Sequence, residues 1–212
     1  MAPERIPLLH AVTDDSVIAR ADFAERAGEV LAAGGADVAL HLRAPRASGR
    51  RMHALAVRLM EIARASGSLL VVNDRVDVAM AARAYGIQLG ARGLSVADAR
   101  RMVGDAMRIG ASVHAVDEAR QVIESGADWL MAGTIFASAS HPGRSGAGVR
   151  LIGELAALGR PVIAIGGMTP ERAAEVRRAG ATGIATIRGI WDAPSPNDAA
   201  RRFIDTWRQE EA

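Results

Sequence analysis

The sequence predicts a single (β/α)8 TIM barrel, an α/β fold across residues 1–212, and two observations support this fold class. Eight short, β-rich apolar runs each end in a polar or glycine turn and are followed by a helical segment. The 212 residues accommodate eight such units with few insertions, at the short end of the class. The runs are residues 8–12, 36–42, 69–72, 86–89, 109–113, 129–132, 161–165 and 183–187.

Capping residues between these runs predict where helices begin and end. The polar cluster at 13–16 suits the start of a first helix, which a pair of glycines ends after residue 33. A helix is also expected over residues 50–65, before another glycine, and a final helix over 197–209 closes the barrel. No linker divides the chain, so we expect one domain.

Composition excludes several classes of function. The net charge is +2, and all 26 strongly basic residues are arginines spread along predicted helix faces. Three Trp, one Tyr and three Phe are too few for an aromatic platform that binds nucleic acid. No cysteine is present, which excludes disulfides and thiolate metal sites. Without a signal peptide or an apolar run of the ~20 residues that cross a bilayer, we expect a cytoplasmic protein without membrane contacts. A homodimer is the expected assembly.

Barrels of this class place their ligand site on the loops that follow the strands. The seventh run leads into Gly166 and Gly167, and the eighth leads into Arg188 and Gly189. Glycine lets backbone N–H groups approach an anion, and the loops after strands seven and eight commonly bind phosphate. These four residues form the predicted phosphate site. The alternative is that the glycines only turn the chain.

Other polar residues follow or precede strand ends. His41 and Arg43 alternate along the second strand and are expected to face the lumen, where Arg43 suits a carboxylate or phosphate. Asp74 follows the third strand and is a candidate metal ligand, general base or helix cap. His114 ends the fifth strand; a lone histidine there is more often structural than catalytic.

One loop, residues 137–148 after the sixth strand, is unusually long and rich in Ser, Gly and Pro. Long loops in compact domains are usually functional or disordered. We expect this loop to be mobile without ligand and to close over the mouth with ligand.

Six motifs resemble, in the same order, the thiamine phosphate synthase/TenI superfamily over essentially the whole chain. The motifs are HAVTD at 10–14, VNDRVD at 72–77, GIQL at 86–89, SVH at 112–114, GTIF at 133–136 and AIGGMTP at 164–170. The resemblance implies a (β/α)8 barrel that binds a phosphorylated thiazole small molecule in thiamine biosynthesis. It implies two enzymatic branches.

The synthase branch joins a pyrimidine diphosphate to a thiazole phosphate with magnesium and releases pyrophosphate. Its pattern implies a second carboxylate at position 93, a Gln at 41, and lysines shortly after Arg43 and at 141. This chain has Gly93, His41, Ala44-Pro45 and His141 at these places. One carboxylate fewer weakens a magnesium site, and the missing lysines remove stabilisation of the leaving group.

The TenI branch isomerises a thiazole carboxylate phosphate to its aromatic tautomer without a metal, and it is the preferred interpretation. Arg43 would bind the carboxylate. Thr134 stands where the tautomerases have a histidine, so His114 or His41 would carry the proton, with His141 as a third candidate. The further predicted substrate contacts are Asn73, Gln88 and Ser112.

Three alternatives stay open. The first is a diverged synthase, in which Asp74 holds Mg²⁺; the preferred interpretation needs no metal and no cofactor. The second is a non-catalytic binding or regulatory paralogue that kept the phosphate site. The third and weaker alternative is a phosphate-sugar isomerase or epimerase, because many barrels share the phosphate corner.

Overall fold

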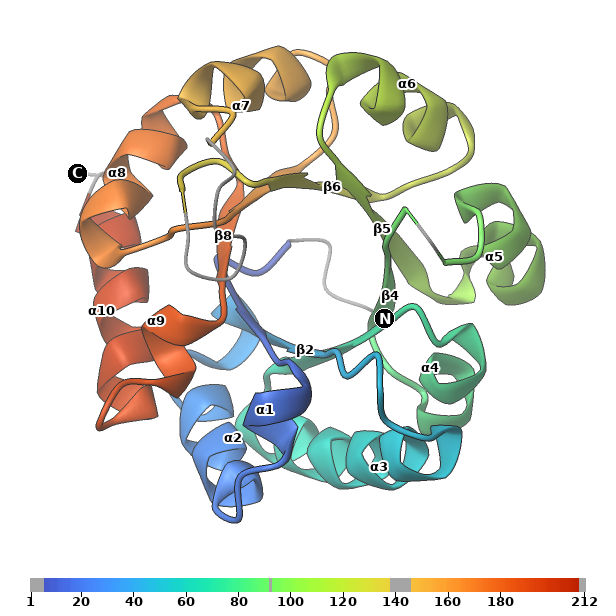
Figure 1. Ribbon diagram of the computed structural model, residues 1–212, viewed down its shortest axis with the longest axis vertical. Helices are drawn as coiled ribbons and strands as arrows, with labels where there is room; N and C mark the ends of the chain where they lie inside the picture. The colour runs from blue at the N-terminus through green and yellow to red at the C-terminus, as the bar shows by residue number, and fades with distance from the viewer. Residues whose placement is uncertain (1–5, 92, 138–145, 210–212) are drawn as a thin grey trace.

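The computed structural model describes residues 6–91, 93–137 and 146–209, which form a closed barrel of eight parallel strands. Each strand pairs with its sequence neighbours, and β8 pairs with β1, so the ring closes in sequence order (Figure 1). The strands are β1 Leu9–Val12, β2 Val38–Leu42, β3 Leu69–Asn73, β4 Gly86–Leu89, β5 Arg108–Val113, β6 Trp129–Gly133, β7 Val162–Ile165 and β8 Gly183–Thr186. The predicted barrel is confirmed, with strand bounds that agree within two residues.

Helices surround the strands on the outside of the ring (Figure 1). They are α1 Asp15–Ile18, α2 Phe23–Leu31, α3 Gly49–Ser66, α4 Val76–Ala82, α5 Val96–Val103, α6 Val116–Glu124, α7 Val149–Ala156, α8 Pro170–Arg178, α9 Arg188–Trp191 and α10 Pro196–Gln209. Side-chain caps set several starts: Ser48 caps α3, Ser95 caps α5, and Thr169 caps α8 with Pro170 at its first turn. None of the described helices has the length and apolar character needed to cross a membrane.

The single helix predicted up to residue 33 is wrong, because the structure has two helices, α1 and α2, in its place. The chain turns between them and then begins α2 with Phe23, whose ring packs on Trp191 of α9 with centroids 5.7 Å apart. In the turn, Arg20 donates to the Trp191 carbonyl and pairs with Asp192 at 2.5 Å. Tertiary contacts with α9 therefore override a locally continuous helix pattern.

Alternate residues of each strand face either the lumen or the helices. The lumen cluster comprises Ile6, Val12, Ala39, Val71, Trp129, Met131, Ile163 and Ala185. Leu40 and Leu42 pack into the larger core between strands and helices. His41, between them, is fully buried on the other face of β2, level with Val71 of β3. The predicted lumen orientation of His41 is therefore confirmed.

A polar network crosses the lumen where β4, β5 and β6 meet. Gln88, Gly110 and Trp129 lie level on the three strands. A Cβ at residue 110 would lie 2.1 Å from the Trp129 ring, so glycine is what lets the indole reach over β5. The indole Nε1 donates to Gln88 Oε1 at 2.9 Å, and Gln88 Nε2 donates to Ser112 Oγ at 3.1 Å.

Gly110→Ala should lower the free energy of unfolding by about 1–3 kcal/mol, because the new methyl group collides with the indole and the Gln88 oxygen. Gly28→Ala in α2 is the matched control, since its Cβ would meet only Ile62 at 3.9 Å. That change should be neutral or stabilise by up to about 1 kcal/mol. Urea unfolding of both variants measures the difference, and equal stabilities would contradict the described packing.

Candidate functional site

Parallel strands place all their carboxyl ends on one rim, which we call the mouth. The predicted site residues that lie at or directly after strand ends are Arg43, Asn73, Ser112, His114, Thr134, Gly166, Gly167, Arg188 and Gly189. His41 and Gln88 lie deeper in the lumen and are 0% and 1% exposed. The fold therefore gathers the predicted residues at one end of the barrel, with most of them at the rim and His41 and Gln88 below it in the lumen.

The turn after β7 requires both of its glycines. Gly166 has φ 103° and Gly167 has φ 63°, which side chains rarely tolerate. A Cβ on Gly166 would lie 2.5 Å from Thr134 Cγ2, and one on Gly167 would lie 2.7 Å from the Ala137 carbonyl. The backbone of this turn therefore lies directly against the loop after β6. It forms a side-chain-free corner beside β8.

Arg188 begins α9 on the other side of this corner. Its guanidinium pairs with Asp14 at 3.2 Å and with Asp192 at 3.7 Å. Burial acts to raise the pKa of Asp14. Hydrogen bonds from Ser16 and from the Val17 N–H, together with the charge of Arg188, outweigh this effect, so the pKa of Asp14 is lowered. The Arg188 side chain is thus held between the loops after β1 and β8 rather than free.

Sequence reasoning missed a second arginine at this corner. Arg172, in α8, donates to the Gly167 carbonyl and stacks on the Phe136 ring at 4.5 Å from its centroid. It therefore fixes the glycine turn from behind and brings positive charge near it. Its position three residues after the Thr169 cap was the available signal, because the first turn of a helix after a phosphate loop lies close to the anion.

Asp74 directly follows β3 in a left-handed conformation with φ 61°. Its Oδ1 accepts from the Gly90 N–H at 2.8 Å, after β4. Arg75 is the N-cap of α4 and no side chain caps that helix, so the helix-cap interpretation of Asp74 is wrong. A Cβ on Gly93 would lie 3.0 Å from Asp74 Oδ1, so a carboxylate at position 93 would stand beside Asp74.

The surroundings of Asp74 determine what kind of metal ion it could hold. No three His, Cys, Asp or Glu side chains within the described ranges are grouped to hold a metal ion. Magnesium in proteins is commonly held by one or two carboxylates together with phosphate oxygens and water. The exposed Asp74 therefore fits a magnesium ion whose other oxygen ligands come from a bound diphosphate, and it does not fit an all-protein site.

Arg43 follows β2, and its backbone is fixed by Thr13. The Thr13 hydroxyl donates to the Arg43 carbonyl at 2.9 Å and accepts from the Arg43 N–H at 2.9 Å. The half-buried Arg43 guanidinium has no ion-pair or hydrogen-bond partner in the part of the chain that the structure describes. It is a candidate cation for an anionic ligand.

Gln88 does not face the mouth directly. Both ends of its amide are bonded, to Trp129 and to Ser112, and its side chain is buried. Because the Gln88 N–H occupies a lone pair of the Ser112 oxygen, the Ser112 hydroxyl hydrogen is free to point elsewhere. The network thus places half-buried Ser112 between Gln88 and the mouth.

His114 is brought beside the strand-six residue that interrupts the tautomerase pattern. Its Nδ1 bonds the carbonyl of Gly133, the residue before Thr134. A carbonyl only accepts, so Nδ1 carries the hydrogen and Nε2 is left as the basic nitrogen. The His114 backbone N–H donates to Glu118 at 2.8 Å. Among the described residues, His114 is the exposed histidine at the rim, which makes it a candidate to exchange protons with a ligand.

His41 instead forms a buried pair with His10, to which the sequence analysis gave no role. His10 Nδ1 lies 2.8 Å from His41 Nε2, and His10 Nε2 lies 3.0 Å from the Pro7 carbonyl. Burial lowers the pKa of His10 to about 4, despite the Pro7 bond. Burial and His10 together lower the pKa of His41 well below its ordinary value, although the Asn73 side chain acts to raise it. Both rings are therefore neutral at pH 7.

Most of the predicted lid, residues 138–145 with His141, lies outside the described residues. The two ends of the loop are joined by backbone hydrogen bonds. The Ala147 N–H donates to the Thr134 carbonyl, and the Gly148 N–H donates to the Ile135 carbonyl, each at 2.9 Å. The loop therefore starts and ends at the same point of the mouth.

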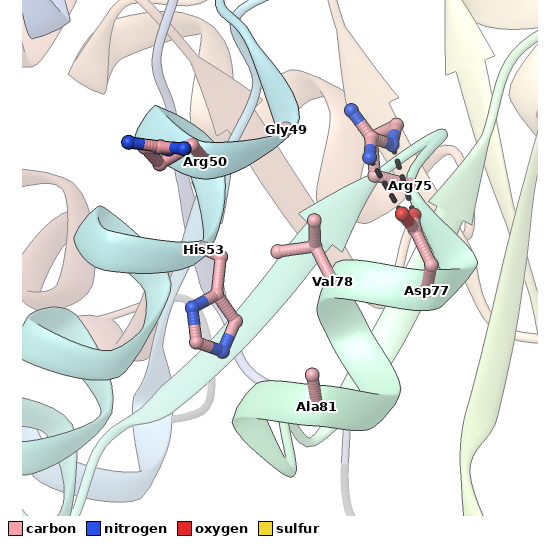
Figure 2. A pocket seen from close by; sticks show the side chains of 7 residues that line it. All are labelled: Gly49, Arg50, His53, Arg75, Asp77, Val78 and Ala81. Atoms are coloured by element: carbon pink, nitrogen blue, oxygen red, sulfur yellow. Dashed lines mark hydrogen bonds and ion pairs between the residues drawn. The ribbon is translucent and has the colours of Figure 1, made fainter.

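A shallow groove of about 310 Å³ lies outside the barrel, between α3 and α4 (Figure 2). Its lining residues are Gly49, Arg50, His53, Arg75, Asp77, Val78 and Ala81. Arg75 pairs with Asp77 at 2.5 Å, so the charge that the groove offers is largely compensated. None of the predicted site residues lines it, and we do not assign it to the site.

The buried histidine pair should make the protein lose stability as the pH falls. In the unfolded chain each histidine takes up a proton near pH 6.5, whereas folded His10 resists protonation down to about pH 4. The stability that neutral His10 contributes is therefore fully present well above pH 6.5 and should fall by about 2 kcal/mol between pH 7 and pH 5, and His41 should add a loss in the same direction.

Urea unfolding at several pH values measures this dependence. His41→Gln should reduce the slope, whereas His53→Gln, at an exposed position of α3, should leave it unchanged. A wild-type protein that is equally stable at pH 7 and pH 5 would contradict the buried neutral pair.

Comparison with known proteins adds an independent observation. A family model described as thiamine monophosphate synthase matches residues 9–190. The thiamine-phosphate synthase of Methanoculleus marisnigri is 40% identical over 199 residues, which cover 93% of both chains. That of Chlorobium luteolum is 41% identical over 200 residues, which cover 93% of this chain and 92% of the relative.

Among solved structures, the thiamine phosphate pyrophosphorylase from Pyrococcus furiosus has a TM-score of 0.84 and 28% identity, with 97% of both chains covered. These relatives carry synthase names, so they favour the synthase alternative over the preferred TenI interpretation. The family model and the first of these relatives each match most of the chain, and the residues that the family model matches include the eight strands of the barrel and the glycine turn after β7. The chain belongs to the thiamine phosphate synthase/TenI superfamily.

Proposed function

We propose that this protein is a thiamine phosphate synthase, which joins a thiazole phosphate to a pyrimidine diphosphate and releases pyrophosphate. The observation that carries the proposal is the identity of about 40% over nine-tenths of the chain to relatives named for this activity. The geometry of the mouth is compatible with two phosphorylated substrates. It offers one anion corner at β7 and β8, and at β2 and β3 a carboxylate, Asp74, together with the Arg43 guanidinium.

The glycine corner would hold the thiazole phosphate. Backbone N–H groups of Gly166, Gly167 and Gly189 lie at the ends of neighbouring strands β7 and β8. Arg172 adds positive charge, while Arg188 is paired there with Asp14 and Asp192. The diphosphate would lie on the opposite side, near Arg43 and Asp74. In this arrangement the two substrates meet across the lumen, and binding alone brings the reacting groups together.

Asp74 would hold the magnesium ion together with the diphosphate oxygens. Such an ion neutralises the charge of a leaving diphosphate. The Arg43 guanidinium would orient the same group by charged hydrogen bonds. Ser112 would offer a hydroxyl hydrogen to the substrate.

One observation favours the thiazole tautomerase as a second candidate. Only Gly93 stands where a second carboxylate would lie beside Asp74, while His114 contacts the residue before Thr134. A tautomerase needs a proton carrier and no metal, and His114 would be that carrier. The two candidates therefore differ in metal requirement and substrates.

The magnesium dependence should decide between them. With thiazole phosphate and pyrimidine diphosphate, purified protein should form thiamine phosphate, and EDTA should abolish the reaction, because Asp74 alone cannot hold the metal against a chelator. Gly93→Asp should lower the magnesium concentration for half-maximal rate at least tenfold, whereas Gly93→Ala, the steric control, should not. Metal-independent isomerisation of the thiazole carboxylate phosphate, without thiamine phosphate formation, would establish the second candidate instead.

Gly167→Ala should weaken thiazole phosphate binding at least tenfold, because its Cβ would lie 2.7 Å from the Ala137 carbonyl and force the turn to move. Gly159→Ala is the matched control, since Gly159 also has a positive φ of 75° but no atom within 4 Å of its Cβ position. Both variants should lose stability from backbone strain, and Gly167→Ala should lose more because its methyl group also collides with its neighbours. Isothermal titration calorimetry measures the affinities, and equal affinities would contradict the assigned corner.

A further inference from the structure

The buried pair of His10 and His41 has a hydrogen-bond direction that the structure determines. His10 Nε2 lies 3.0 Å from the Pro7 carbonyl, which can only accept, so this nitrogen carries the hydrogen. Because His10 is neutral, its Nδ1 is then a lone pair. His41 Nε2, 2.8 Å away, must donate to it. The neutral His41 ring is therefore left with an unprotonated Nδ1.

This His41 Nδ1 needs a hydrogen-bond donor. His41 Nδ1 is buried and has no hydrogen-bond partner within the described residues. Asn73 lies on the neighbouring strand, one lumen position above the level of His41, and its side chain acts to raise the His41 pKa, as an oxygen that faces the ring does. The Asn73 Oδ1 is also buried and also without a partner. An acceptor oxygen facing a lone pair leaves both groups unsatisfied, which is costly in a buried place.

A half-turn of the Asn73 amide removes this conflict. Exchanging its oxygen and nitrogen lets Nδ2–H donate to His41 Nδ1 and turns Oδ1 away from the ring. The opposite solution, a hydrogen on His41 Nδ1, would reverse the whole chain and set a His10 lone pair against the Pro7 carbonyl. Protonating either ring would place a charge in the closed lumen. Of these arrangements, only the half-turn gives His41 Nδ1 a donor and keeps the hydrogen bond from His10 to the Pro7 carbonyl.

We propose that His10 is a positioning residue: it fixes the tautomer of His41, which in turn holds the Asn73 amide with its nitrogen inward and its oxygen toward the mouth. Asn73 then accepts a hydrogen bond from an N–H or O–H group of the ligand and repels phosphate oxygens. This assignment makes the substrate contact expected of Asn73 more specific. The chain runs in one direction, from Asn73 through His41 and His10 to Pro7.

The first test needs no variant and no substrate. Nitrogen-15 NMR of the histidine rings at pH 7 distinguishes the two neutral tautomers from the protonated ring. His10 and His41 should both carry the hydrogen on Nε2, and an Asn73 amide hydrogen should show a nuclear Overhauser contact with the His41 ring. A hydrogen on His41 Nδ1, or a protonated ring at pH 7, would overturn the proposal.

The second test uses variants at His10 and rests on the proposed function, because its probe is the pyrimidine diphosphate, whose amino group is a donor. His10→Phe removes the acceptor and keeps a ring, whereas His10→Asn keeps an acceptor near the Nδ1 position. His10→Phe should alter the His41 tautomer signal and weaken binding about 2- to 10-fold, the worth of one net hydrogen bond. His10→Asn should restore both.

Inorganic pyrophosphate is the matched probe, because it has no amino group. Its affinity should be equal in wild type, His10→Phe and His10→Asn. An equal loss for pyrophosphate would show that His10 acts only on general packing and would overturn the positioning role. If wild-type protein binds neither probe, the proposed function fails, while the NMR measurement still decides the tautomer and the orientation of Asn73.

Discussion

The pairing of the first strand with the last is the interaction on which the rest of the structure depends. β1 and β8 join in parallel register, Leu9 beside Ile184 and Ala11 beside Thr186, and the Ile184 N–H donates to the Leu8 carbonyl at 2.8 Å. This pairing turns an open sheet into a ring without edges and closes the lumen to water. It also brings together the loops after the two strands, so that Asp14 and Arg188 form an ion pair at the rim.

Local pattern predicted the barrel because its elements are repetitive. Each buried parallel strand is a short apolar run, and the alternation along 40–42 was enough to turn His41 inward. The pairing of His41 with His10 could not be predicted from local pattern, because it joins residues 31 positions apart on two different strands. Arg172 was missed because it resembles the many other arginines on helix faces, and its position three residues after the Thr169 cap was the one signal that set it apart before the fold placed it on the glycine turn.

Packing constrains the two sides of the mouth to different degrees. The glycine turn after β7 depends on atoms of the β6 loop that leave no space for a side chain, so its geometry is closely constrained. The side near Asp74 is less constrained, since the nearest atom to a Cβ on Gly93 would be Asp74 Oδ1, at 3.0 Å, the far end of a side chain rather than a strand backbone. Such a barrel can therefore accept new side chains on one side of its mouth while the turn on the other side keeps its shape.

The tryptophan that spans β5 gives the protein an optical property. Two hydrogen bonds, through Gln88 and Ser112, separate the Trp129 indole from the rim. The other two tryptophans lie elsewhere: Trp191 donates to the Val12 carbonyl, and Trp207 lies beside Arg177. Indole emission responds to the polarity and hydrogen bonding of its surroundings. The barrel interior therefore contains its own fluorophore, which hydrogen bonds connect to the mouth. A ligand that bonds Ser112 would change the surroundings of the indole and thereby shift the wavelength of its emission.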